Sequence, residues 1–189
     1  MTTITMKEGS PRWGNLLAQL TTKQADTAAR RALNRAGDAA RTAMKAPLKQ
    51  QTGLKAGIIN RALKVQRANY QVLAYRITVR GGDIRLKYFS PRETRSGVSA
   101  NPFNARQRFA GTFLKGGRFP NRVALDRGNG QVFRRVGKER LPLRVVRSGV
   151  RLPDQVVQGA ARQAFDTVGR EKLIERMSHE LNRLVQGNG

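Results

Sequence analysis

Cysteine is absent from this 189-residue chain, and acidic residues, aromatic residues and long apolar runs are all scarce. Without cysteine the chain can form neither a disulfide nor a thiolate metal site. No apolar run approaches the roughly 18 residues that span a bilayer, and residues 1–14 lack the apolar centre of a secretory signal. We therefore expect a soluble protein of a reducing cytoplasm that makes no membrane contact.

The scarcity of acidic residues leaves 37 Lys and Arg against 12 Asp and Glu, a formal net charge of +25. Residues 39–153 hold 26 of these cations and only four anions, whereas residues 152–189 hold five of each. Self-repulsion on this scale opposes compaction unless a polyanion or an acidic partner is close by. Arg outnumbers Lys, and guanidinium groups suit bidentate contacts with phosphate. The charge predicts a polyanionic partner, and the alternative is a merely solvated basic face.

Catalytic groups are also few. The single histidine, His179, has no second histidine near it in the sequence, which favours a surface or packing role. The carboxylates are scattered singly, whereas a magnesium-dependent nuclease needs two or three on its metals. The glycines of residues 128–130 lack both the spacing and the following helix of a phosphate-binding loop. We predict no catalytic residue, no cofactor site and no metal site, so that an enzyme, such as a nuclease, is the least favoured reading.

Helices are predicted at both ends of the chain. Small apolar residues, mostly Ala, recur at three- and four-residue spacing over residues 21–45, which predicts an amphipathic helix that Pro47 ends or bends. A shorter helix is predicted to follow a cap at Thr52. Residues 153–186 carry two similar stripes that are offset near Gly169. They predict a long C-terminal helix with a bend or break at that glycine.

Strands are predicted between these helices. Residues 73–79 and 84–88 alternate apolar and polar side chains, and the turn at 81–83 is predicted to join them into a hairpin. Residues 90–108 are rich in Pro and Gly and predict a long exposed loop or an irregular edge strand. Further strands are predicted within residues 122–126, 131–136 and 141–148.

Together these elements predict an α+β fold. It comprises an antiparallel β-sheet or small barrel, Ala-rich N-terminal helices and a long C-terminal helix. The length fits one domain over residues 1–189, with residues 1–20 as an extended N-terminal arm and residues 153–186 as the C-terminal helix.

Basic and aromatic residues alternate within residues 101–122. Phe103, Phe109, Phe113 and Phe119 could stack on bases, but the shortage of large side chains favours a place for them in the core. The cations from residue 92 to residue 122 are the candidates for DNA contact, independent of sequence. These DNA-facing candidates are Arg92, Arg95, Arg106, Arg108, Lys115, Arg118 and Arg122.

Residues 130–149, "GQVFRRVGKERLPLRVVRSG", first suggest a hairpin that grips nucleic acid. The apolar residues within it favour a core hairpin with its cations on the outer side. These apolar residues are Val132, Phe133, Leu141, Leu143 and Val145.

The chain resembles the minor tail protein Z family, the tail completion proteins of long-tailed bacteriophages and prophages. The similarity lies in "AARRALNRAGDAARTAMK", "TGLKAGIINRALKVQRA", "IRLKYFSPRETRSGVSA", and "AGTFLKGG" followed by "GQVFRRVGKERLPLRVVRSGVRLP". Thr112 and Leu143 stand where Ala and Ile are more usual, and residues 147–154 replace a common Gly-Pro-Ser turn. The positions that match the family's most specific motif are Gly111, Phe113, Phe133, Arg135, Gly137, Arg140, Leu141 and Pro142.

The resemblance implies a structural virion protein that completes the head-proximal end of the tail, at the neck or head-tail connector. It implies tail terminator, tail tube or connector proteins as partners, and no catalytic residues. An oligomeric ring around double-stranded DNA and contact with the genome end are inferred from such an architecture. The alternative is a sequence-independent nucleic-acid-binding protein of the host, associated with ribosomes or the chromosome.

Overall fold

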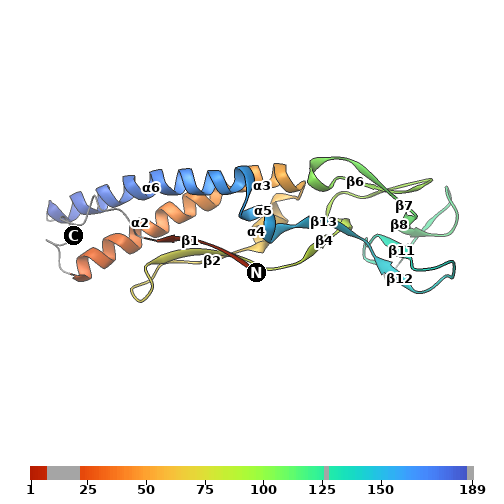
Figure 1. The fold of residues 1–189 in the computed structure, drawn as a ribbon, viewed down its shortest axis with the longest axis horizontal. Helices are drawn as coiled ribbons and strands as arrows, with labels where there is room; N and C mark the ends of the chain where they lie inside the picture. The colour runs from red at the N-terminus through yellow and green to blue at the C-terminus, as the bar shows by residue number, and fades with distance from the viewer. Residues whose placement is uncertain (8–21, 126–127, 187–189) are drawn as a thin grey trace.

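The computed structural model describes residues 1–7, 22–125 and 128–186. The molecule is elongated, with two long helices at one end and many short strands at the other (Figure 1). The helical elements are α2 (Thr22–Ala43), α3 (Lys45–Thr52), α4 (Ala56–Ala62), α5 (Leu152–Val156), α6 (Gly159–Val185) and the 3-10 turns η2 (Leu86–Tyr88) and η3 (Pro102–Asn104). The strands are β1 (Thr2–Lys7), β2 (Leu63–Gln66), β3 (Ala74–Val79), β4 (Asp83–Arg85), β5 (Arg92–Thr94), β6 (Gly97–Ala100), β7 (Gln107–Ala110), β8 (Thr112–Phe113), β9 (Lys115–Gly116), β10 (Val123–Ala124), β11 (Phe133–Arg135), β12 (Leu143–Val145) and β13 (Arg147–Arg151).

The predicted α+β class is confirmed, with antiparallel pairing throughout the described strands. The strands form separate small sheets of two or three strands. The sequence predicts either an antiparallel sheet or a small barrel. The described residues form open antiparallel sheets and no closed barrel.

Helices α2 and α6 lie antiparallel and side by side along the long axis (Figure 1). Ala29 and Ala32 of α2 pack with Met177 and Leu181 of α6 in a buried cluster. The small Ala side chains allow the two helix axes to approach closely. The apolar periodicity of both segments is thus explained by one shared interface.

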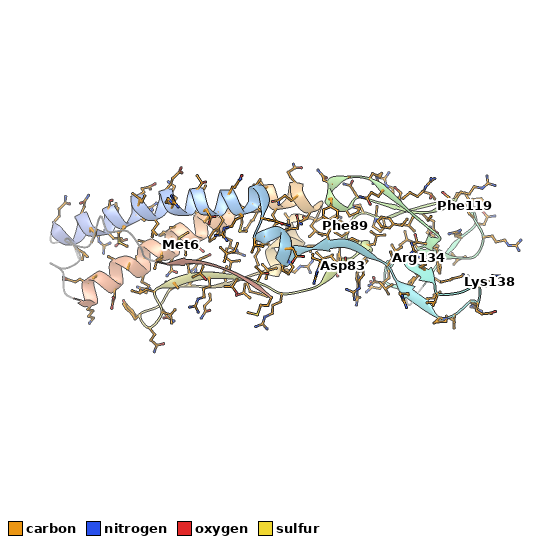
Figure 2. The ribbon with its side chains drawn as sticks, in the orientation of Figure 1. Met6, Asp83, Phe89, Phe119, Arg134 and Lys138 are labelled. Carbon is orange, nitrogen blue, oxygen red and sulfur yellow. The ribbon has the colours of Figure 1, made fainter. Side chains whose placement is uncertain are left out.

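The predicted break at Gly169 is wrong, because α6 is continuous from Gly159 to Val185. A Cβ at position 169 would collide with the side chain of Met6, which comes from β1 and lies beside the helices (Figure 2). The glycine therefore provides space for a neighbouring strand. The break in the C-terminal region lies earlier, at residues 157–158 between α5 and α6.

The prediction that Pro47 interrupts the first helix is confirmed. Helix α2 ends at Ala43, and Pro47 lies in the first turn of α3, where its missing N–H costs no hydrogen bond because the first N–H groups of a helix have no partner within it. Thr52 ends α3: its hydroxyl donates to the carbonyl of Leu48 at 2.7 Å and accepts from the N–H of Leu54 at 3.2 Å. The next helix, α4, is therefore not capped directly by Thr52.

Strand β3 is the centre of a sheet with the order β1-β3-β2. Ile77 pairs with Ile4 on one side and with Val65 on the other. Residues 2–7 of the predicted extended arm form an edge strand of this sheet. Residues 8–20 of the predicted arm lie outside the described residues.

The predicted hairpin around residues 81–83 is wrong, because β3 and β4 do not pair with each other. Both edges of β3 are already occupied, so the chain crosses at Gly81 and Gly82 to β4, which pairs with β13. Residues 86–88, predicted as strand, form the 3-10 turn η2.

In the segment predicted as a long exposed loop or irregular edge strand, residues 90–108, about half of the residues belong to strands. Strands β5, β6 and β7 form an antiparallel sheet in that order. Val98 and Ala100 of β6 are buried, because their face of the sheet packs on the core. The alternate residues point outward, so this Pro- and Gly-rich segment presents an ordered outer face.

The predicted hairpin over residues 130–149 is confirmed as a backbone element, since β11 pairs with β12 in antiparallel register. Its predicted core is confirmed only in part. Val132 is fully buried, but Leu141 is 67% exposed at the hairpin turn. This hairpin projects to the far end of the molecule, where Lys138 lies (Figure 2).

The core prediction for four phenylalanines is wrong for two of them. Phe103 is 43% exposed and Phe119 is 46% exposed. The core instead uses Tyr75, Phe89 and Phe165 as its large side chains. Few aromatic residues are needed because Ala, Leu, Ile and Val fill most of the interior.

Candidate nucleic-acid interface

The predicted DNA-facing cations come from the strand-rich end of the molecule. Six of the seven are exposed: Arg92, Arg95, Arg106, Arg108, Lys115 and Arg118. Most of this end is built from narrow sheets and connecting turns, so long side chains on their outer faces extend into solvent. The structure therefore makes these six groups accessible to a large ligand.

Three of these cations share the outer face of the β5-β6-β7 sheet. Ser99 of β6 pairs with Arg92 on one side and with Arg108 on the other. Arg106 Nη1 donates to Ser99 Oγ at 3.2 Å, and Arg108 Nη1 donates to Ser96 Oγ at 3.1 Å. Because residues two apart on a strand face the same way, the three guanidinium groups form one basic row across the sheet.

Arg122 differs from the other six candidates. It forms an ion pair with Glu93, and the two side chains are only 18% and 11% exposed. Glu93 Oε2 also accepts the backbone N–H groups of Leu114 and Lys115, at 3.2 Å and 3.0 Å. This carboxylate therefore ties three parts of the strand-rich end together, and Arg122 has a structural partner within the chain.

A surface hollow of about 330 Å³ brings two exposed candidates close to three motif residues, Gly111, Phe113 and Arg135. Arg95, Lys115, Arg122 and Arg135 contribute to its lining, and among the residues that the structure describes no carboxylate does. The hollow is small compared with a duplex, so it fits a single anionic group.

The family-motif positions form the hairpin and the turn before it. Gly111 has φ of 67°, a left-handed conformation that glycine adopts without strain, between β7 and β8. The rings of Phe113 and Phe133 lie 6.2 Å apart across paired strands, and the Arg135 guanidinium lies 5.6 Å from the Phe113 ring centre. The remaining motif positions belong to the exposed hairpin turn and its approach: Gly137, Arg140, Leu141 and Pro142.

The cations of residues 130–149 were predicted to lie on the outer side of a core hairpin and were set aside as candidates, but three of them belong to a second basic surface. Arg85, Arg134, Arg144 and Arg147 line a groove of about 560 Å³ together with Val145 and Val146. The alternation of Arg and Val along the chain was visible in the sequence. The pairing of strands that brings these arginines together was not, because it depends on strand register.

The cations of the helical end are more evenly balanced. Arg31 lies 3.4 Å from Glu180, and Arg67 lies 2.7 Å from Asp38. Helices α2 and α6 together hold ten cations and six anions, whereas residues 83–151 hold 17 cations and four anions. Residues 83–151 therefore carry +13 of the net charge of +25, at a higher density than the two long helices. Residues 1–82 carry the other +12, because residues 152–189 are neutral.

Potential catalytic groups do not gather in the described part of the chain. Within residues 1–7, 22–125 and 128–186, no group of three or more His, Asp and Glu side chains could hold a metal ion. His179 is exposed on α6. Many of the carboxylates form ion pairs with Arg or Lys. These carboxylates are Asp38, Glu93, Asp154, Asp166, Glu175 and Glu180.

The sequence model of the prophage minor tail protein Z family matches residues 15–188. The chain belongs to this family. No curated protein and no solved structure matches it. Membership in the minor tail protein Z family, which the sequence resemblance predicted, makes the chain a phage minor tail protein with a structural role in the virion.

As a minor tail protein, the chain has other phage tail or head components as its partners. This family membership favours the phage interpretation over a host ribosome- or chromosome-associated protein. No helix in the described ranges has the length and apolar character needed to cross a membrane.

Proposed function

We propose that this minor tail protein Z family member completes the head-proximal end of the tail at the head-tail junction and contacts the genome end in the channel. Its protein partners are a tail terminator, tail tube or head-tail connector protein. It acts as a structural part without a catalytic step. The single observation that carries the DNA contact is the uneven distribution of charge along the molecule.

The charge distribution supports both DNA as the ligand and a particular orientation of the protein toward it. The strand-rich end carries exposed Arg and Lys with few carboxylates, while α2 and α6 are closer to neutral. Duplex DNA carries one negative charge per about 1.7 Å of its axis, so the strand-rich end faces the duplex. The helical end is then available for protein neighbours.

Several copies arranged as a ring would surround an axial duplex. One short chain can enclose a channel only through a closed cyclic assembly, in which each copy makes the same head-to-tail contact. The elongated shape lets the two ends of each copy face different surroundings (Figure 1). In this arrangement the DNA contacts are made to phosphates and are independent of sequence.

The DNA contact is tested by fluorescence anisotropy with a labelled blunt duplex from about 50 to 300 mM salt. Wild-type protein is expected to bind different sequences equally, with log K falling linearly against log salt. R92Q/R108Q is expected to reduce the slope by about two, because each lost phosphate contact reduces it by about one. R35Q/R170Q removes the same charge from the helical end and should leave the slope unchanged.

Affinity that does not change with salt would contradict the phosphate contact. The position in the particle is tested separately, by electron cryomicroscopy of purified virions. Density for the chain at the tail tip instead of the neck would contradict the head-tail junction role. Incubation with plasmid and magnesium tests the absence of catalysis, since nicking abolished by one carboxylate substitution would establish a nuclease.

A further inference from the structure

The groove lined by Arg85, Arg134, Arg144, Arg147, Val145 and Val146, here named the arginine groove, lies between two sheets. Arg134 and Arg144 belong to β11 and β12 of the distal hairpin, and Arg85 and Arg147 belong to β4 and β13. The chain passes directly from one sheet to the other, because a single residue, Val146, separates β12 from β13. The backbone N–H of Val146 donates to the carbonyl of Val132 at 2.8 Å, which fixes this crossing.

Strand register places like charges directly opposite each other twice in this groove. Arg134 pairs with Arg144 across β11 and β12, and Arg85 pairs with Arg147 across β4 and β13. Residues directly opposite on antiparallel strands have Cα atoms about 4.5–5.5 Å apart, and like charges at such positions destabilise a sheet. A groove with two such pairs is poorly explained by stability of the isolated chain.

The chain itself does little to neutralise these four arginines. Across the described ranges, none of the four makes an ion pair, and no carboxylate lines the groove. Arg147 Nη1 donates to the backbone carbonyl of Asp83 at 2.8 Å. With its amide oxygen facing the cations, buried Gln131 accepts from Arg85 Nη1 at 3.0 Å and from Lys87 Nζ at 3.1 Å. These neutral acceptors position the guanidinium groups and leave their charge available.

The arginine groove also continues an existing basic surface. Arg134 Nη2 donates to the carbonyl of Ala110, the last residue of β7, at 3.3 Å. Arg108 lies two residues earlier on the same strand, in the basic row of the β5-β6-β7 sheet. The cations thus form a track that runs from this sheet to the distal hairpin and on to β4 and β13.

We propose that the arginine groove binds the phosphodiester backbone of duplex DNA, and that it is the main phosphate contact of the protein. The proposal rests on the proposed function, which brings the strand-rich end to the genome. A second copy of the chain is a poor ligand, because the chain has 12 carboxylates against 37 cations. A linear polyanion with regularly repeated charges matches an extended track better than a discrete acidic patch on another protein does.

The test compares R134Q/R144Q with wild type and with R35Q/R170Q, using the labelled duplex and salt range above. The groove variant is expected to reduce the salt slope by about two and to weaken binding at about 100 mM salt by at least about tenfold. R35Q/R170Q should match wild type. If R92Q/R108Q weakens binding but R134Q/R144Q does not, the groove proposal fails while the proposed DNA contact stands. If wild type does not bind duplex DNA at all, both fail.

Arg144→Glu distinguishes a ligand site from a structural one. It replaces a like-charge pair by an ion pair with Arg134, so the Tm of the free protein should rise by about 2 °C while DNA affinity falls. A loss of both stability and affinity would mean that the arginines hold the hairpin together, and would overturn the proposal. Poly-glutamate that binds the wild type more tightly than the duplex, at equal charge concentration, would assign the groove to an acidic protein and overturn it as well.

Discussion

Tyr75 is the largest side chain that the described part of the structure buries completely. Its ring packs on Gly37 of α2, where a Cβ would collide with the ring atoms. Its hydroxyl donates to Asp38 Oδ1 at 2.9 Å, and Asp38 also accepts from Arg67. A glycine within a helix lowers stability by about 1 kcal/mol relative to alanine. The close contact between α2 and the Tyr75 ring explains why position 37 is nevertheless glycine.

The first prediction concerns Tyr75 and alkaline pH. Burial, followed by the hydrogen bond to Asp38, raises the pKa of Tyr75 above its ordinary value of 10.0. The phenol therefore ionises in the unfolded chain before it ionises in the folded protein. Its contribution to stability is complete below about pH 10 and is lost above it, by up to about 1.4 kcal/mol per pH unit.

Urea denaturation between about pH 8 and pH 11.5 measures this effect. Tyr75→Phe should be less stable by about 1 kcal/mol at neutral pH, because it lacks the hydrogen bond, but should show a shallower alkaline decline. Tyr70→Phe is the control, since hydrogen bonding to Thr27 and Arg30 lowers the pKa of this exposed residue. Equal alkaline slopes for Tyr75→Phe and wild type would contradict the prediction.

The second prediction concerns Glu93, whose side chain connects several segments of the strand-rich end. Glu93→Ala leaves the nearly buried Arg122 without its partner and removes the acceptor for two backbone N–H groups. We expect a loss of about 3 kcal/mol, as for other broken buried ion pairs. Asp166→Ala breaks an exposed pair with Arg162 on α6 and should cost less than about 1 kcal/mol. Similar urea midpoints for the two variants would disprove the structural role of Glu93.

At the scale of elements, α6 begins without a local side-chain cap. Gln51 of α3 supplies the missing contacts: its Oε1 accepts from the N–H of Ala161 at 2.9 Å, and its Nε2 donates to the carbonyl of Gln158 at 3.2 Å. Gly159 has φ of 65°, and a Cβ there would approach the Gln51 amide closely. A distant residue thus fixes where the longest helix starts.

Gln51→Ala should destabilise the protein by about 1 kcal/mol, the usual cost of losing a helix cap. Amide hydrogen exchange should accelerate at Ala161, whose N–H loses its acceptor. Gln50→Ala is the matched control, because Gln50 contacts Asn104 and not α6. Unchanged exchange at Ala161 in Gln51→Ala, or equal acceleration in both variants, would show that α6 does not depend on this cap.

The helices could be predicted more fully than the sheets, and the reason lies in the range of the interactions. The three- and four-residue spacing that predicted α2 and α6 acts within one segment. The hairpin prediction at residues 81–83 used the same local reasoning and failed. The edge of β3 that β2 leaves open is occupied by β1, which lies far earlier in the sequence, at residues 2–7. Pairing between distant strands leaves no local pattern in the sequence.

At the scale of the whole molecule, the sequence predicted which residue type would dominate the candidate interface but not its geometry. The cations from Arg92 to Arg122 were predicted to lie along an exposed loop, and the structure places Arg92 and Arg108 in a row across a sheet. Arg122 could not be separated from the others, since Glu93 is 29 residues away. The arginine groove depends on two strand registers, which the composition of a segment does not determine.

The last prediction follows from the net charge of +25. The strand-rich end carries +13 of this charge within residues 83–151. Its sheets have only two or three strands, so repulsion should weaken that end first. Raising sodium chloride from about 50 to 500 mM shortens the Debye length to a few ångströms and should raise the Tm of the free protein by about 5 °C.

Duplex DNA should produce a similar rise at low salt, because a ligand that binds only the folded state stabilises it, and this gain should vanish at 500 mM salt as phosphate binding is lost. Dextran of equal mass is the control for crowding. Hydrogen exchange should locate the stabilisation in β5 to β13 and leave the α2–α6 interface unchanged. Protection of that helical interface instead would mean that the polyanion binds the opposite end of the molecule.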